Sequence, residues 1–172
     1  MDSIVNKVAE SGIISLDLAK YLPAEGTVVL FDIKPFLFRE MILKEKDFRE
    51  SMKNHDWQQY GGKFVAIHCS VDAVIPVWAY MLVTAYLEPY AANTYFGSVE
   101  ELSRKIIAAN IGQMDTSDYA DKRVVLKGCG DIAIPEIAYI AATEKLKPVV
   151  KSLMYGEPCS TVPIYKQPLK RD

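Results

Sequence analysis

The chain is poor in the residues that build disulfide frameworks and histidine-rich sites, with three cysteines and two histidines in 172 residues. An odd cysteine count argues against a complete disulfide framework. The first ten residues lack the basic-then-apolar pattern of a secretory signal, and three free thiols are typical of a reducing cytoplasm. We therefore expect a cytoplasmic protein.

Positive charge and long apolar runs are also scarce. The formal net charge is -2, which gives no reason to expect the basic face that binds nucleic acid phosphates. The longest uncharged apolar run, residues 75–87, is too short to span a bilayer and is interrupted by Pro76 and Thr84. We expect neither a nucleic acid nor a membrane as a partner.

Common catalytic and nucleotide-binding motifs are missing from the sequence. It has no Walker A loop, no G-x-G-x-x-G, no G-x-S-x-G and no H-E-x-x-H. Residues 128–130, Gly-Cys-Gly, are too short a glycine pattern to indicate phosphate binding. Half of the residues are hydrophobic and a quarter are charged, which is ordinary for a globular protein. A length of 172 residues predicts a single domain over residues 1–172.

An internal repeat is the strongest positive signal. Residues 56–97 and 115–156 align without gaps at an offset of 59, with 13 identities in 42 positions. The matched pairs include Pro76 with Pro135 and Tyr80 with Tyr139. A repeat of this length indicates one supersecondary unit used twice.

Each copy reads as a β-loop-α-β unit. Apolar segments predict the opening strands, and a proline at the start of each apolar stretch marks the first turn of a helix. The helix of the first copy is apolar almost all round, so we expect it to be well buried. The predicted ranges are strands 63–68 and 122–127, helices 76–88 and 135–147, and closing strands 93–96 and 151–155.

Other segments fit the same pattern. Residues 27–33 predict a buried strand and residues 45–54 a helix. Ser98 and Glu101 form a capping-box signature for a helix over 99–110. Alternating strands and helices predict an α/β fold with a mainly parallel sheet flanked by helices. A flexible tail is expected over about 161–172.

The three cysteines follow predicted strands. Cys69 comes directly after strand 63–68, Cys129 after strand 122–127, and Cys159 just past the last strand. Because parallel strands end at one edge of a sheet, we expect the three thiols to converge there. Three thiolates suit zinc, copper(I) or an iron–sulfur cluster. Further candidate ligands are His68, Asp72 and Asp131.

Other interpretations remain open for the same residues. Buried inert cysteines are common, and the chain has no Cys-x-x-Cys pair. Cys129, which precedes a predicted helix, is the expected nucleophile of a thiol enzyme or sulfur carrier. The matched aspartates suit helix capping, and the matched tyrosines suit core packing. A protein-binding module with structural cysteines is the third hypothesis.

Four segments resemble a bacterial family catalogued only as domain of unknown function 2480. The segments are LKEKDFRESMKNHDW at 43–57, CSVDAVIPVWAYM at 69–81, KGCGDIAIPE at 127–136 and MYGEPCSTVPIYK at 154–166. The family name implies no activity. Members often sit in gene clusters with iron–sulfur assembly components, so the resemblance implies such proteins as partners and favours a role in iron–sulfur or metal metabolism.

Overall fold

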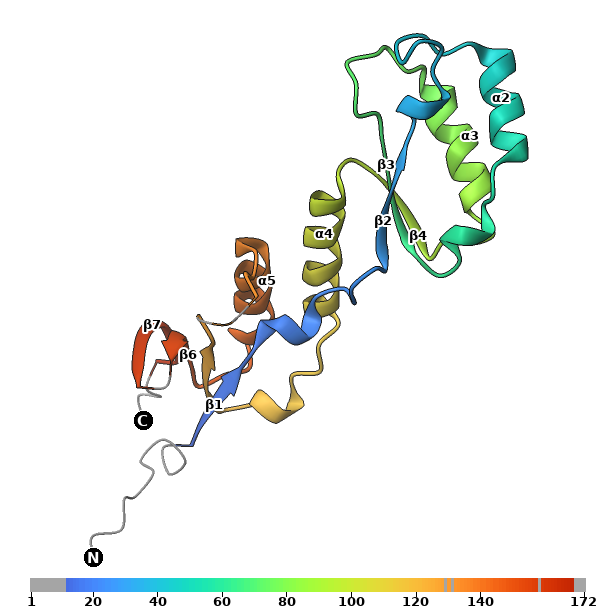
Figure 1. The fold of residues 1–172 in the computed structure, drawn as a ribbon. Coiled ribbons are helices and arrows are strands. Elements are labelled where there is room, and N and C mark those ends of the chain that lie inside the picture. Colours follow the sequence, from blue (N-terminus) through green and yellow to red (C-terminus); the bar gives the residue numbers. More distant parts are fainter. Residues whose placement is uncertain (1–11, 129, 131, 158, 169–172) are drawn as a thin grey trace, which may run out of the picture. The chain divides into compact units, whose positions relative to one another are not determined.

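The computed structural model describes residues 12–128, 130, 132–157 and 159–168. It divides into two compact units, each with its own sheet and its own hydrophobic core (Figure 1). The central unit is Pro23–Lys105, and the terminal unit combines Met1–Leu22 with Ile106–Asp172. Whether the chain is a single domain is not tested by this division and stays a prediction.

The central unit is built on three parallel strands in the order β2-β3-β4. Apolar side chains of helices α2 and α3, such as Phe48 and Val83, pack in one core with those of strands β2 and β3, such as Phe31. The bounds are β2 Val28–Asp32, α2 Glu45–Asn54, β3 Phe64–His68, α3 Val77–Leu87 and β4 Asn93–Phe96.

Aromatic rings fill much of the central core. Phe31 stacks on Phe36 and Trp57, with centroid distances of 5.4 Å in both pairs. The Trp57 indole N–H donates to the Met52 carbonyl at 2.7 Å, which satisfies the one polar atom of this buried ring. The segment between α2 and β3 is therefore fixed to the end of α2.

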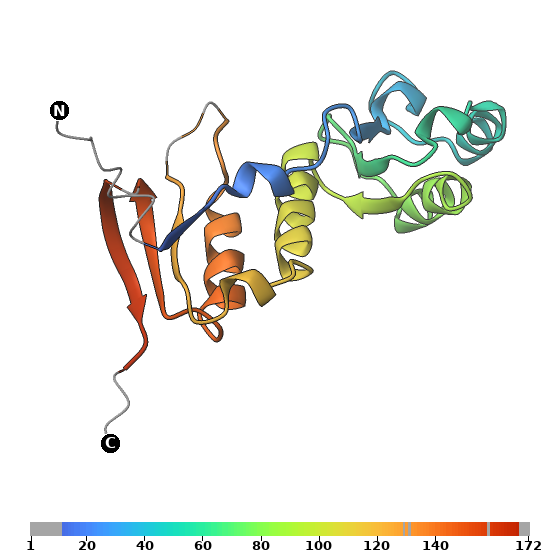
Figure 2. The same cartoon turned by 90° about the horizontal axis from the view of Figure 1, so that it is seen from below.

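The terminal unit has a four-stranded sheet in the order β1-β5-β6-β7. The first three strands are parallel, and β7 adds to the edge in the antiparallel sense (Figure 2). Helix α5 and the second half of α4 supply Ala142, Leu146, Ile107 and Ile111 to its core. The bounds are β1 Ile13–Leu16, α4 Val99–Gly112, β5 Arg123–Leu126, α5 Glu136–Leu146, β6 Ser152–Glu157 and β7 Ser160–Lys166.

The predicted α/β fold with mainly parallel strands flanked by helices is confirmed, and the strands form two sheets rather than the one sheet that the sequence predicted. The predicted capping box is present too: Glu101 N–H donates to Ser98 Oγ at 3.1 Å, and Ser98 N–H donates to Glu101 Oε2 at 2.8 Å. The range of the expected flexible tail, about 161–172, overlaps β7, in which the segment STVPIYK pairs with β6.

Elements of the two units lie 59 residues apart. Helices α3 and α5 have this offset at both ends, as do the first residues of β4 and β6. Their fully buried residues correspond as well, with Leu87 and Leu146 at the ends of the two helices. The origin of these units by duplication stays a prediction.

The strands that precede the two copies of the repeat also correspond, with equivalent residues 15 positions apart in the sequence. Asp17 follows β1, and Asp32 ends β2. Leu16 of β1 pairs with Leu126 of β5, and Phe31 of β2 pairs with Ile67 of β3. Each aspartate directly follows one of these paired residues, so both lie beside the end of the neighbouring parallel strand. Each aspartate also accepts a backbone N–H two residues on, at 2.9 Å and 3.0 Å, and a 3₁₀ turn follows.

The inference of one shared sheet edge for the cysteines is wrong. Strands β3 and β5, which precede Cys69 and Cys129, belong to two different sheets. The alternation of strands and helices along the chain is the same for one sheet as for two, so the local pattern does not distinguish them.

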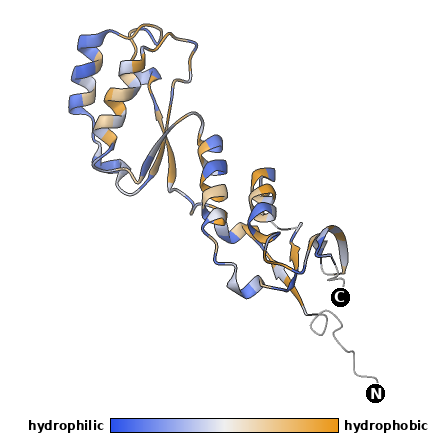
Figure 3. Ribbon diagram, turned by 180° about the vertical axis from the view of Figure 1, so that it is seen from behind, coloured by the Kyte–Doolittle hydropathy of each residue, from blue (hydrophilic) through white to orange (hydrophobic). Residues whose placement is uncertain are grey.

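Helix α3 also differs from expectation. Its apolar sequence predicts burial on all sides, but only Ala79, Val83 and Leu87 are fully enclosed. Val77 and Met81 are 74% and 67% exposed. The hydrophobic colouring of α3 contrasts with the hydrophilic outer helix α2 (Figure 3). One face of α3 therefore presents apolar side chains to solvent.

Candidate ligand pocket

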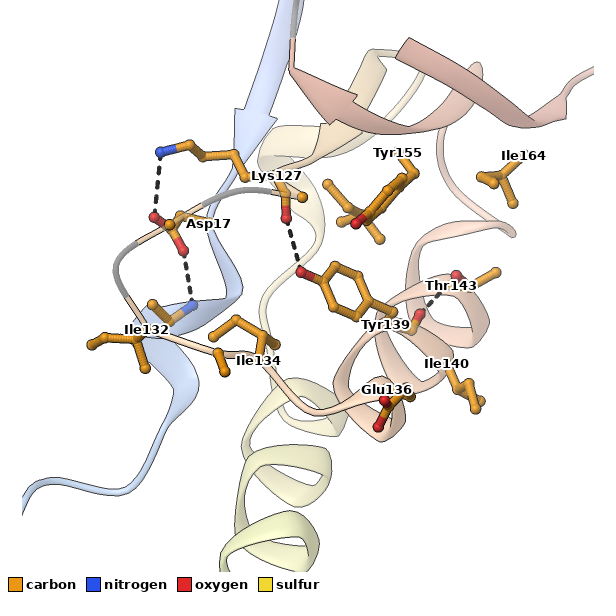
Figure 4. Close-up of a pocket in the computed structure, with 15 residues that line it drawn as sticks. Asp17, Lys127, Ile132, Ile134, Glu136, Tyr139, Ile140, Thr143, Tyr155 and Ile164 are labelled. Atoms are coloured by element: carbon orange, nitrogen blue, oxygen red, sulfur yellow. Dashed lines mark hydrogen bonds and ion pairs between the residues drawn. The ribbon is translucent and has the colours of Figure 1, made fainter. Parts of the chain in front are cut away.

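A cavity of about 940 Å³ opens at the carboxyl ends of β1, β5 and β6 in the terminal unit. Ligands of open parallel sheets usually bind at this end, because the loops that follow the strands gather there. Figure 4 shows its lining side chains, which come from β7 and α5 as well as from the strand ends. Every lining residue belongs to this one unit.

An ion pair lies at one side of the cavity. Lys127 Nζ is 3.5 Å from Asp17 Oδ2, and both side chains are partly exposed. The Ala19 N–H, which donates to Asp17, lowers the pKa of that carboxyl, and Lys127 lowers it further against the opposing effect of partial burial. Asp17 is therefore held ionised and in a fixed orientation.

Two tyrosine rings form an aromatic wall. Tyr139 donates its hydroxyl to the Lys127 carbonyl at 3.0 Å, which joins α5 to the end of β5. Its ring meets Tyr155 edge to face at a centroid distance of 5.5 Å. Gly128 makes room for this arrangement, since a Cβ there would lie 2.7 Å from Tyr155 Cζ.

Isoleucines supply the apolar part of the lining. Ile132 and Ile134 come from the loop before α5, Ile140 from α5 and Ile164 from β7. Three of these side chains are more than half exposed: Ile132, Ile140 and Ile164. Apolar side chains that line a concavity and remain open to solvent are typical of a ligand site.

The charges at the cavity are unequal in number. Among the lining residues that the structure describes, Asp17 and Glu136 contribute two carboxylates, and Lys127 contributes one ammonium group. Glu136 also lies in the first turn of α5, where the positive end of the helix dipole stabilises its negative charge. The cavity can thus offer hydrogen-bond acceptors next to an apolar surface.

The central unit has a related arrangement of side chains at the ends of β2 and β3. Asp32 accepts the Ser70 hydroxyl at 2.6 Å and the Ser70 N–H at 3.0 Å. Burial alone would raise the pKa of Asp32, but the hydrogen bonds from Ser70 and Lys34 outweigh it and lower the pKa. Tyr80 meets Phe96 edge to face, as Tyr139 meets Tyr155.

The residues predicted as metal ligands are divided between the units. His68 ends β3 and is exposed, Cys69 is half-buried against the central core, and Asp72 is exposed. Cys159 is an exposed thiol between β6 and β7 of the terminal unit. Cys129 and Asp131 lie outside the described residues.

The predicted function in metal or iron–sulfur binding through three cysteines is wrong. In the part of the chain that the structure describes, no group of three or more His, Cys, Asp or Glu side chains could hold a metal ion. Cys69 and Cys159 follow strands of two separate sheets rather than one shared edge. The zinc or iron–sulfur cofactor and the assembly-protein partners are not tested by these observations and stay predictions.

Sequence reasoning missed most of the pocket. The sequence places Lys127 only at the end of a strand and predicts core packing for Tyr139, whereas in the structure Tyr139 is half-buried and lines the cavity. A usable signal was present in the two segments that contain the aspartates. Residues 17–22 read DLAKYL and residues 32–37 read DIKPFL, with aspartate, an aromatic and leucine at the same spacing.

The described helices include none that is both long enough and apolar enough to cross a membrane. A cytoplasmic location stays a prediction.

Comparison with known proteins places the chain in a family without assigning it an activity. No curated protein and no solved structure matches the chain. A family model described as "Protein of unknown function (DUF2480)" matches residues 2–167. Because this match covers nearly the whole sequence, the chain belongs to the DUF2480 family.

Proposed function

We propose that the terminal unit is a binding module for a small organic molecule with an apolar body and a hydrogen-bond-donating, amine-like end. The observation that carries this proposal is the cavity of about 940 Å³, with exposed isoleucines along one part and carboxylates along another. Its volume lies within the range of drug-sized ligand sites.

The apolar walls favour the body of such a ligand. Covering the exposed faces of Ile140 and Ile164 removes apolar surface from water, at roughly 25 cal/mol per Å². Tyr139 and Tyr155 add a rigid aromatic surface, because Tyr139 is held by its hydrogen bond to the Lys127 carbonyl. The shape is therefore largely formed before a ligand arrives.

The polar groups favour a donor at the other end of the ligand. Lys127 already has Asp17 as a partner, which leaves the second carboxylate, Glu136, to accept from the ligand. An anionic ligand would have to approach both carboxylates, and like charges oppose binding. We expect amines to bind better than carboxylates of the same size.

A matched pair of probes tests the class of ligand. Phenethylamine and 3-phenylpropanoate share an aromatic body and differ in the sign of the end group. In ligand-observed NMR titrations of the full chain, the amine should bind about three-fold more tightly or better, and Glu136→Gln should reduce that preference. Equal affinities for the wild type, unchanged in Glu136→Gln, would contradict the assigned role of Glu136.

A matched pair of variants tests the location. Ile140→Ser removes apolar surface from the cavity wall without adding a charge and should weaken phenethylamine binding about ten-fold, whereas Ile137→Ser on the same helix should leave it unchanged. Ile137 is partly exposed and does not line the cavity. Equal effects of the two variants would place the bound amine elsewhere.

A further inference from the structure

The outer edge of the central sheet carries an unexplained apolar surface. Strand β4 pairs with β3 on one side, and no described residue pairs with its other side. Phe96 at its end is 66% exposed and touches Tyr80 of α3. We call Phe96, together with the exposed Val77 and Met81 of α3, the strand-docking surface.

The terminal unit shows what occupies the corresponding edge. Strand β6 corresponds to β4 at the offset of 59, and β7 pairs with it along Ser152–Glu157. Ile164 of β7 lines the same cavity as Ile140 and Tyr155. Ile140 and Tyr155 correspond to Met81 and Phe96, so in the terminal unit a strand of the same chain pairs with the edge beside these positions, whereas no described strand pairs with the outer edge of β4.

Two further observations indicate a missing neighbour. Helix α3 is apolar all round, which is typical of a helix enclosed by protein, yet its outer face is open. An uncharged sheet edge next to exposed large apolar side chains is a template for another strand. Stretch 73–87 and the sequence of β4 contain no charged residue, and the nearby Lys105 of α4 places its ammonium group over the Tyr95 ring, 4.3 Å from its centre.

One charge difference specifies the chemistry of the occupant. In the terminal unit, Lys147 at the end of α5 places its Nζ 5.7 Å from the centre of the Tyr165 ring of β7. The residue that corresponds to Lys147 is Glu88, at the end of α3. A strand in the place of β7 would therefore meet a carboxylate, and a basic side chain complements it.

We propose that β4 and the strand-docking surface bind an extended segment of a partner protein by antiparallel strand addition. The segment carries an apolar residue that covers Met81 and Phe96 and, directly after it, a basic residue that faces Glu88. Main-chain hydrogen bonds to β4 supply affinity, and these two side chains supply specificity.

Two synthetic peptides test this proposal on the full chain. Both have acetylated and amidated ends and the β7 sequence Ser-Thr-Val-Pro-Ile-Xaa-Lys, with lysine or glutamate in place of Tyr165. In NMR titrations, the lysine peptide should bind the wild type about three-fold more tightly than the glutamate peptide. Glu88→Lys should reverse that order.

Further variants test the apolar contact. Phe96→Ser and Met81→Ser should each weaken the lysine peptide about ten-fold, and Ile137→Ser, a partly exposed isoleucine on α5, should have no effect. Shifts should appear in β4 and α3. The proposal is overturned if neither peptide binds up to its solubility limit, if Glu88→Lys leaves their order unchanged, or if the shifts are confined to β6 and α5, which would mean exchange with β7.

Discussion

Gly128→Ala should destabilise the terminal unit, because the added methyl group meets the aromatic wall of the pocket. The new Cβ would lie 2.7 Å from Tyr155 Cζ and 2.8 Å from its hydroxyl oxygen. Normal carbon contacts are about 3.5–4.0 Å, so the ring must move by roughly an ångström. The backbone itself tolerates alanine, since Gly128 is not among the residues with positive φ.

The size of the effect follows from two contributions. Forcing a methyl group into a filled site costs typically about 1–3 kcal/mol, and loss of the edge-to-face contact with Tyr139 costs about 0.5–1.5 kcal/mol. Tyr155 is 40% exposed and can swing outward, so we expect a total near the lower end, about 1–2 kcal/mol. In the central unit Cys69 stands at the position of Gly128, and Phe96, which corresponds to Tyr155, is 66% exposed but keeps its edge-to-face contact with Tyr80, which also favours the lower value.

Urea unfolding of matched variants measures this cost. Gly130→Ala is the control, because a Cβ at Gly130 meets no described residue within 4 Å. It should be neutral or should stabilise by about 0.4–1 kcal/mol through the lower entropy of the unfolded chain. Adding Gly128→Ala to a Tyr155→Ala background should cost little. Equal stability of the two alanine variants in the otherwise wild-type chain would refute this reasoning.

Three further predictions concern the rest of the chain. Burial lowers the pKa of His55 below its ordinary 6.5, so the unfolded chain binds a proton at His55 at higher pH than the folded chain does. The free energy of unfolding should therefore fall as pH drops below about 6.5. In urea titrations, His55→Gln should weaken this dependence on pH, and an unchanged dependence would assign it to other groups. Ser98→Ala removes the capping box and should lower the free energy of unfolding by about 1 kcal/mol in urea titrations. An unchanged free energy of unfolding would mean that the cap does not stabilise α4. Leu87→Ala and Leu146→Ala empty fully buried sites and should each cost about 2–5 kcal/mol in urea unfolding; a cost below 1 kcal/mol at either site would contradict the assigned core.

The elements were predictable because their signals are local. Prolines and glycines mark the ends of α3, α5, β4 and β6, and the predicted helices agree with the structure within about two residues. The capping box of α4 is likewise a pattern of four adjacent residues. Such features depend on the chain near each residue, so they can be recognised without knowledge of the fold.

The arrangement of the strands was not predictable in the same way. Pairing of β1 with β5, rather than with β2, depends on contacts between residues about a hundred positions apart. Strand β7 was not predicted because it contains Pro163, and a proline argues against a strand in a sequence. In the structure Pro163 lies next to an irregularity in an edge strand, where proline is tolerated. The pocket joins Asp17, Lys127 and Tyr155, which share no motif, so it emerges only when the sheet is assembled.

The most direct test of the ligand pocket is a methyl NMR titration with phenethylamine on the full chain labelled at isoleucine. We predict that the methyl signals of Ile132, Ile134, Ile140 and Ile164 shift together and saturate with one dissociation constant. The signals of the core residues Ile107 and Ile111 should remain in place. Shifts spread over isoleucines of both units, or no saturable shift of the four pocket methyls, would contradict the account.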